Sequence, residues 1–236
     1  MGETIEIITS DGPMPAALAE PSGTPKGGIV VIQEAFGLTD HIVDITRRVA
    51  DAGWLAIAPA LFHRQGSPVF DYGDYEKMFP VFKELTATGV EVDVDATLAV
   101  LAERGFPAER TGMVGFCMGG SVTMQTAARL PLGAAVTFYG GGVAEGRFGF
   151  PSCLDIAADL KTPWLGLYGD LDKGIPVDDV EALRVGVKQA KVDTEIVRYA
   201  QADHGFNCDA RESYHAPSAT DAWARTLAWF DRHIGA

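Results

Sequence analysis

The pentapeptide Gly115-Phe116-Cys117-Met118-Gly119 places a cysteine between two glycines, where a short apolar run meets a helical run. Residues 110–115 are typical of a buried strand, and residues 119–128 are typical of a helix. A sharp turn from strand to helix needs small residues beside its central residue, because the backbone there is strained and closely packed. The N-terminus of the helix faces the sulfur and favours the thiolate. The pattern therefore predicts a nucleophilic cysteine rather than a buried structural one.

Short apolar runs alternate with helical segments along the rest of the chain. We expect strands at residues 4–9, 14–19, 28–33, 54–60, 134–139, 164–168 and 194–199, and helices at residues 40–52, 93–104, 177–190 and 216–233. Residues 63–89 are loop-rich and aromatic, and form either a lid or a surface loop. This alternation predicts a single α/β domain over residues 1–236, with a mostly parallel sheet covered by helices on both faces. In such sheets the site lies at the carboxyl ends of the strands.

Composition excludes several classes of partner. The net charge of −13 disfavours nucleic acids and anionic membrane surfaces. Three cysteines and an N-terminus without a secretory pattern indicate a reduced, cytoplasmic protein. No apolar run approaches the length of a membrane span, and no Cys-x-x-Cys or His-Glu-x-x-His pattern suggests a metal. We expect a protein that acts on a small molecule without a metal or cofactor. The oligomeric state stays open, and the lack of an evident exposed apolar stripe is compatible with a monomer.

A thiol nucleophile needs a base, and the base needs a group that orients it. His204 follows the last expected strand, in Ala202-Asp203-His204-Gly205-Phe206. Asp172 follows the strand at residues 164–168, and Asp170 in the same turn competes with it for the role of the acid. The chain order of nucleophile, acid and histidine is that of α/β-hydrolases.

Glu34 stands directly after the apolar strand at residues 28–33, at the sheet edge expected to carry Cys117. A buried carboxylate there needs a partner, so Glu34 either tunes the protonation of Cys117 or simply begins a solvated loop. In α/β-hydrolases the loop after this strand supplies one oxyanion donor, and the residue after the nucleophile supplies the other. These donors would be the backbone N–H groups of Ala35 and Met118.

Other residues near these motifs allow two interpretations. Phe36 and Tyr139 either line a substrate pocket or only pack in the core. His63 and Arg64 are expected to be solvated loop residues rather than substrate contacts. Cys153 and Cys208 are expected to have no chemical role.

Six segments together make the chain resemble the dienelactone hydrolase (carboxymethylenebutenolidase) family. They are Gln33-Glu34-Ala35-Phe36-Gly37, Ala58-Pro59-Ala60-Leu61-Phe62, Gly115 to Gly120, Tyr139-Gly140, Gly169 to Asp172 with Pro176, and His204-Gly205-Phe206. The resemblance implies an α/β-hydrolase fold and a triad of Cys117, His204 and Asp172. It also implies that Glu34 contacts the resting thiol and helps to deprotonate it when substrate arrives.

The chain departs from the family pattern where the substrate would bind. Family members that act on dienelactone resemble one another in an arginine four residues after the catalytic histidine, and this chain has Cys208 there, with Arg211 out of register. We expect a hydrolase of carboxylic esters or enol lactones, with a dienelactone-type substrate. The alternatives are a catalytically weak scaffold that binds a small carbonyl ligand or a protein partner, and a thioesterase or acyltransferase.

Overall fold

A computed structural model describes residues 3–234, in which eight strands form one sheet in the order β1-β2-β4-β3-β5-β6-β7-β8. The strands are β1 (Glu3–Thr9), β2 (Gly12–Ala19), β3 (Gly28–Ile32), β4 (Leu55–Pro59), β5 (Thr111–Phe116), β6 (Ala134–Phe138), β7 (Trp164–Gly169) and β8 (Thr194–Tyr199). β2 pairs antiparallel with both β1 and β4, and all the other pairs are parallel. The mostly parallel α/β sheet predicted from the sequence is confirmed.

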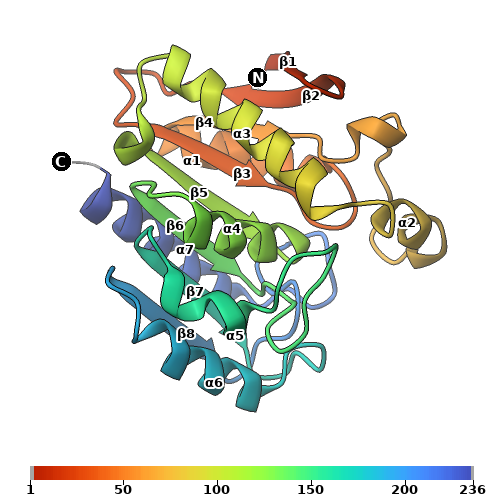
Figure 1. The fold of residues 1–236 in the computed structure, drawn as a ribbon. Helices are drawn as coiled ribbons and strands as arrows, with labels where there is room; N and C mark the ends of the chain where they lie inside the picture. The colour runs from red at the N-terminus through yellow and green to blue at the C-terminus, as the bar shows by residue number, and fades with distance from the viewer. Residues whose placement is uncertain (1–2, 235–236) are drawn as a thin grey trace.

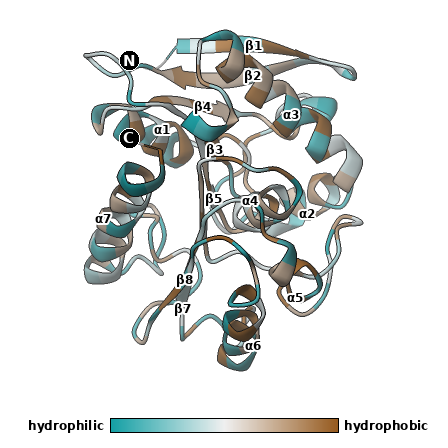
Figure 2. Ribbon diagram, turned by 60° about the vertical axis from the view of Figure 1, so that its left-hand side comes forward, coloured by the Kyte–Doolittle hydropathy of each residue, from teal (hydrophilic) through white to brown (hydrophobic). Residues whose placement is uncertain are grey.

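Helices cover both faces of this sheet (Figure 2). They are α1 (Asp40–Asp51), α2 (Tyr75–Phe82), α3 (Ala87–Glu103), α4 (Met118–Arg129), α5 (Cys153–Ile156), α6 (Val177–Val187) and α7 (Ala216–His233), with short 3-10 turns at His63–Gln65, Ala108–Arg110 and Ala157–Asp159. α1 and α7 lie on one face, and α3, α4 and α6 lie on the other. Among residues 3–234, no helix combines the length and apolar character needed to cross a membrane.

The apolar runs of the sequence become the centre of the sheet. Every residue of β3, β4, β5, β6 and β7 is buried, because helices cover these strands on both sides. α1 buries Ile42, Ile45 and Val49, the stripe that its helical spacing predicts. The strongly packed centre holds the carboxyl ends of β3, β5 and β7 in fixed positions along one edge of the sheet.

The segment between β4 and α3 differs most from the prediction. It contains α2, which lies beyond the carboxyl ends of the parallel strands (Figure 1). Pro80 lies inside this helix, and a proline within a run argues against a helix when only the sequence is considered. α3 also begins at Ala87, six residues earlier than expected, because the Thr86 side chain caps it by accepting from the Gly89 N–H.

Candidate active site

Cys117 occupies the turn between β5 and α4, as the glycine pattern predicts. Its backbone has φ 54° and ψ −114°, a conformation that residues with a side chain rarely adopt. A Cβ atom at Gly115 would overlap the backbone of Gly119, and one at Gly119 would overlap the Ile32 carbonyl oxygen. The two glycines are therefore required sterically, because the start of α4 packs directly against β3 and β5.

Two backbone N–H groups are free to face a reacting carbonyl at this turn. Met118 is the first residue of α4, so its N–H has no partner within the helix. Ala35 lies in the turn after β3, and the pairing of Ile32 with Gly115 brings this turn beside the start of α4. Neither N–H donates to a hydrogen bond found among residues 3–234. Both remain available as oxyanion donors.

His204 and Asp172 meet through a short hydrogen bond. Nδ1 of His204 lies 2.6 Å from Oδ2 of Asp172, and Oδ1 of Asp172 accepts from the Gly174 N–H at 2.8 Å. Asp172 is buried. Asp170 turns away and forms two hydrogen bonds with Arg198, at 2.7 and 2.8 Å. Of the two acids that the sequence leaves open, the geometry favours Asp172.

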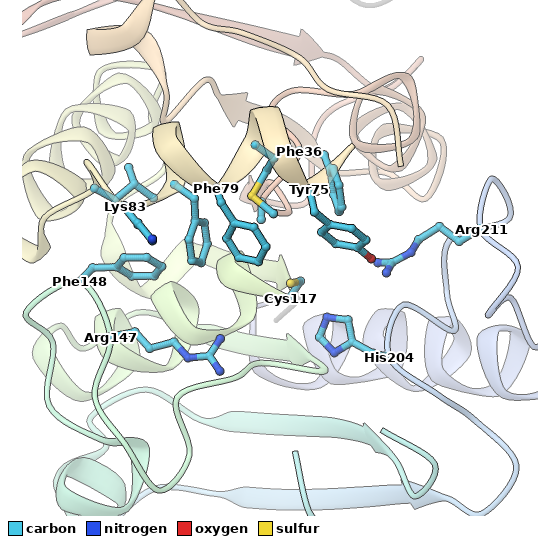
Figure 3. A pocket seen from close by; sticks show the side chains of 13 residues that line it. Phe36, Tyr75, Phe79, Lys83, Cys117, Arg147, Phe148, His204 and Arg211 are labelled. Carbon is cyan, nitrogen blue, oxygen red and sulfur yellow. The ribbon is translucent and has the colours of Figure 1, made fainter. Parts of the chain in front are cut away.

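The electrostatic surroundings of His204 favour its protonated form. Burial by itself would lower the pKa of His204, but the charge of Cys117 and the hydrogen bond to Asp172 outweigh it and raise the pKa to about 10. Cys117 and His204 both line the same cavity (Figure 3). The raised pKa of His204 therefore favours an imidazolium at the cavity that Cys117 also lines.

Glu34 is completely buried and is held by two partners other than the thiol. The Tyr72 hydroxyl donates to Oε2 at 2.8 Å, and Nη1 of Arg211 donates to Oε1 at 3.2 Å. No hydrogen bond between Glu34 and Cys117 is found in the described part of the chain. In place of the expected contact with the resting thiol, Glu34 forms an ion pair with Arg211 and accepts a hydrogen bond from Tyr72.

Tyr72 and Arg211 are the partners of Glu34 that the sequence pattern does not indicate. Arg211 stands seven residues after His204, so counting positions makes it appear displaced. Successive turns fold this loop, with the Cys208 N–H donating to the Gly205 carbonyl and the Arg211 N–H donating to the Cys208 carbonyl. Because of these turns, the loop folds back and Arg211 reaches Glu34. The number of residues between His204 and Arg211 does not reveal this.

A cavity of about 620 Å³ opens above Cys117 and His204. Its wall is largely apolar and includes five Phe and Tyr side chains, and Figure 3 shows Phe36, Tyr75 and Phe79 gathered over the thiol. The lining residues are Ala35, Phe36, Tyr75, Met78, Phe79, Phe82, Lys83, Leu85, Cys117, Arg147, Phe148, His204 and Arg211. α2 supplies much of this wall, so residues 63–89 contribute a cover to the site.

Phe36 and Tyr139 have different positions relative to this cavity. Phe36 lines it, whereas Tyr139 is fully buried and does not. The Tyr139 ring packs against His204, with ring centroids 5.1 Å apart. Tyr139 therefore supports the histidine from behind, and the pocket-lining interpretation of Tyr139 is wrong.

His63 is not the solvated loop residue that the sequence indicated, whereas Arg64 is exposed as expected and binds the same carboxylate as His63. Nε2 of His63 lies 3.0 Å from Oδ1 of Asp93, and Nη1 of Arg64 donates to Oδ2 of Asp93 at 2.7 Å. Asp93 is completely buried in α3 and needs these partners. These hydrogen bonds connect the 3-10 turn His63–Gln65, which precedes α2, to α3, which follows α2.

The remaining cysteines are protonated, buried groups. Burial raises the pKa of Cys153 to about 12 and that of Cys208 to about 11. Among residues 3–234, no three His, Cys, Asp or Glu side chains are grouped so as to hold a metal ion.

Comparison with known proteins identifies the family. The family model described as "Dienelactone hydrolase family" matches residues 14–234. A Yersinia pestis protein named "Putative carboxymethylenebutenolidase" is 41% identical over 238 residues, which cover 98% of this chain and 88% of that protein. An Escherichia coli K12 protein of the same name is 40% identical, covering 94% and 83%. A crystal structure of a Klebsiella pneumoniae protein named "Putative Dienelactone Hydrolase" is 41% identical, with a TM-score of 0.88 and 98% of each chain covered. The chain belongs to the dienelactone hydrolase family and shares its α/β-hydrolase fold.

Proposed function

We propose that this chain hydrolyses carboxylic esters or enol lactones, with Cys117 as nucleophile, His204 as general base and Asp172 as the acid that orients His204. The observation that carries the proposal is the Cys117 turn, which opens into the same cavity as a histidine bound to Asp172 at 2.6 Å. Family membership supports the hydrolase class. The substrate is a small molecule, and the cycle needs no cofactor.

In the first half of the cycle, the Cys117 thiolate attacks the ester carbonyl carbon and forms a carbon–sulfur bond. The N–H groups of Met118 and Ala35 stabilise the oxyanion, and each such donor is worth about 3 kcal/mol in the transition state. The intermediate then expels the alcohol or enolate, which takes a proton from the His204 imidazolium. The product of this step is a thioester on Cys117.

In the second half, neutral His204 takes a proton from water as the water attacks the thioester carbonyl. Asp172 holds the imidazole in the required orientation through its bond to Nδ1. Collapse of this intermediate releases the carboxylic acid, and the thiolate returns beside the imidazolium. The raised pKa of His204 favours this protonated imidazole in the resting enzyme.

A cysteine nucleophile restricts the range of esters. Thiolate is itself a good leaving group, so in the tetrahedral intermediate it competes with the substrate's own leaving group. A simple alkoxide or an amide nitrogen loses this competition, whereas a stabilised enolate or phenolate wins it. Activated esters and enol lactones are therefore the favoured substrate class.

Arg211 supports a dienelactone-type substrate despite its shifted position in the sequence. It lines the cavity together with Cys117 and places a guanidinium there, although Glu34 pairs with this guanidinium and Cys208 occupies the expected arginine position. The aromatic wall formed by Phe36, Tyr75 and Phe79 suits a flat, conjugated ring. A dienelactone combines a flat enol lactone with one carboxylate.

The test compares turnover of cis- and trans-dienelactone with turnover of p-nitrophenyl acetate, using wild type and Cys117→Ala. We expect hydrolysis of dienelactone that disappears in the variant. Hydrolysis of the neutral ester alone would keep the mechanism and change the substrate class. Absence of any turnover that depends on Cys117 would refute the proposal.

A further inference from the structure

The cations of the cavity are not equally neutralised. Arg211 is paired with Glu34 at 3.2 Å. Arg147 and Lys83 also line the cavity, and neither side chain forms an ion pair or hydrogen bond with any residue between 3 and 234. Figure 3 shows Arg147 and Lys83 on one side of Cys117 and Arg211 on the other. The unneutralised positive charge is thus at the end of the cavity away from Arg211.

Both unpaired cations come from anchored backbone. Arg147 lies in the loop after β6, and its guanidinium rests against Gly141, where an added Cβ would lie 2.7 Å from Nη1. The Gly141 carbonyl accepts from the Ser121 hydroxyl of α4 at 2.6 Å, which fixes this part of the loop. Lys83 caps the end of α2, where its N–H donates to the Phe79 carbonyl. The absence of a side chain at Gly141 therefore leaves the space that Arg147 occupies.

An aromatic pair accompanies these two cations. The rings of Phe82 and Phe148 meet edge to face, with centroids 4.6 Å apart, and both line the cavity. Arg147 and Lys83 are themselves exposed, so an anion can reach them from solvent beside this apolar surface. This end of the cavity can hold an apolar stem that finishes in a charged group.

The charge at this end contrasts with the rest of the chain. The protein carries a net charge of −13, so an anion is repelled in general and needs a local positive field. Two carboxylate residues, Glu145 and Asp179, line an adjoining cavity together with Arg147. Neither forms an ion pair with Arg147. The positive charge of Arg147 therefore remains available to a ligand.

We propose that Arg147 and Lys83 form an anion-binding subsite that selects esters carrying a remote carboxylate or phosphate. The inference rests on the proposed ester hydrolysis at Cys117 and adds its substrate class. The guanidinium can bind two oxygens of such a group at once, and the ammonium adds a third donor. The ester carbonyl lies at Cys117, the apolar stem passes Phe148, and the anion ends at Arg147.

The kinetic test uses two esters with the same leaving group. One is mono-p-nitrophenyl adipate, whose acyl chain ends in a carboxylate, and the other is its neutral methyl ester. The quantity measured is the ratio of kcat/KM for the anionic ester to kcat/KM for the neutral ester. The proteins are wild type, Arg147→Gln, Lys83→Gln and the double variant. Arg104→Gln is the matched control, because Arg104 is the C-cap of α3 and pairs with Glu20.

We expect the ratio to fall about tenfold or more in the double variant, the loss expected for at least one charge-assisted hydrogen bond. The single variants should each show part of this fall, and Arg104→Gln should keep the wild-type ratio. Equal ratios in wild type and the double variant, with hydrolysis still dependent on Cys117, would overturn the subsite and leave the proposed function intact. Failure of wild type to hydrolyse either ester would instead contradict the proposed function.

A second measurement does not depend on turnover, so it remains informative if a variant loses activity. Adipate or phenyl phosphate is added while iodoacetamide alkylates Cys117, and the alkylation rate is followed by mass spectrometry. Both anions should slow alkylation of wild type and of Arg104→Gln, and protection should be lost in the double variant. Stronger protection by one anion identifies carboxylate or phosphate as the preferred group. Equal protection of wild type and the double variant would refute the subsite.

Discussion

Replacing Arg211 with Gln removes the only cation that forms an ion pair with Glu34 among residues 3–234. Glu34 is completely buried, and Arg211 is itself mostly buried. Two unit charges about 4 Å apart attract by about 4 kcal/mol at an effective dielectric constant near 20. Leaving one partner of a buried pair uncompensated typically costs about 3–5 kcal/mol. The hydrogen bond from Tyr72 remains and water can reach the cavity, so we expect a loss of about 3 kcal/mol in the free energy of unfolding.

Urea denaturation monitored by fluorescence measures this loss. A chain of this size loses roughly 2–4 °C in Tm per kcal/mol, so Tm should fall by about 6–12 °C. Arg198→Gln is the control, because its bonds to Asp170 are partly exposed and worth about 1 kcal/mol or less. Combining Arg211→Gln with Glu34→Gln should recover most of the loss. A loss below about 1 kcal/mol, or a double variant no more stable than Arg211→Gln, would show that the unpaired charge of Glu34 does not destabilise the fold.

Three further predictions concern the triad and its turn. Asp172→Asn should lower kcat/KM for an activated ester by about 10³–10⁴-fold, whereas Asp170→Asn should keep it within a few-fold, as steady-state kinetics will show. Gly119→Ala should fail to fold, or its free energy of unfolding from urea denaturation should fall by more than about 3 kcal/mol, because the added Cβ would overlap backbone atoms. Gly23→Ala is the control: its Cβ enters open space, so the free energy of unfolding should change by less than about 0.5 kcal/mol. The pKa of His204, raised to about 10, predicts stability that is complete below about pH 6.5 and is lost as the pH rises through 10. Urea midpoints between pH 7 and 10.5 should therefore decline, and should decline less in Cys117→Ala and in Asp172→Asn. Slopes equal to that of wild type in both variants would contradict the assigned causes of the raised pKa.

The parts of this fold that follow from local sequence were predictable. Continuous apolar runs mark β3, β5 and β7, because strands buried on both faces tolerate few polar residues. The glycines around Cys117 mark the turn, because steric exclusion at Gly115 and Gly119 is a local property. Chain order then indicated His204 and an aspartate after β7.

The contacts that depend on the path of a loop were not predictable. α2 forms despite Pro80 because Met78 is buried in an apolar cluster, with Val81 and Phe82 packed against that cluster, and this packing outweighs the local preference. Arg211 reaches Glu34 only through the successive turns of its loop. Asp93 is paired with His63 and Arg64 because a buried carboxylate needs partners, yet nothing in the sequence shows that Asp93 is buried.

The proposed mechanism requires Cys117 to form a covalent thioester with the substrate. Rapid mixing with p-nitrophenyl acetate, acid quenching and intact-mass measurement test it directly, with peptide mapping to find the modified residue. We predict one acetyl group on Cys117 in wild type, and greater accumulation in His204→Gln, where water is no longer activated. An acetyl group on another residue, or substrate hydrolysis at the wild-type rate by Cys117→Ala, would contradict the account.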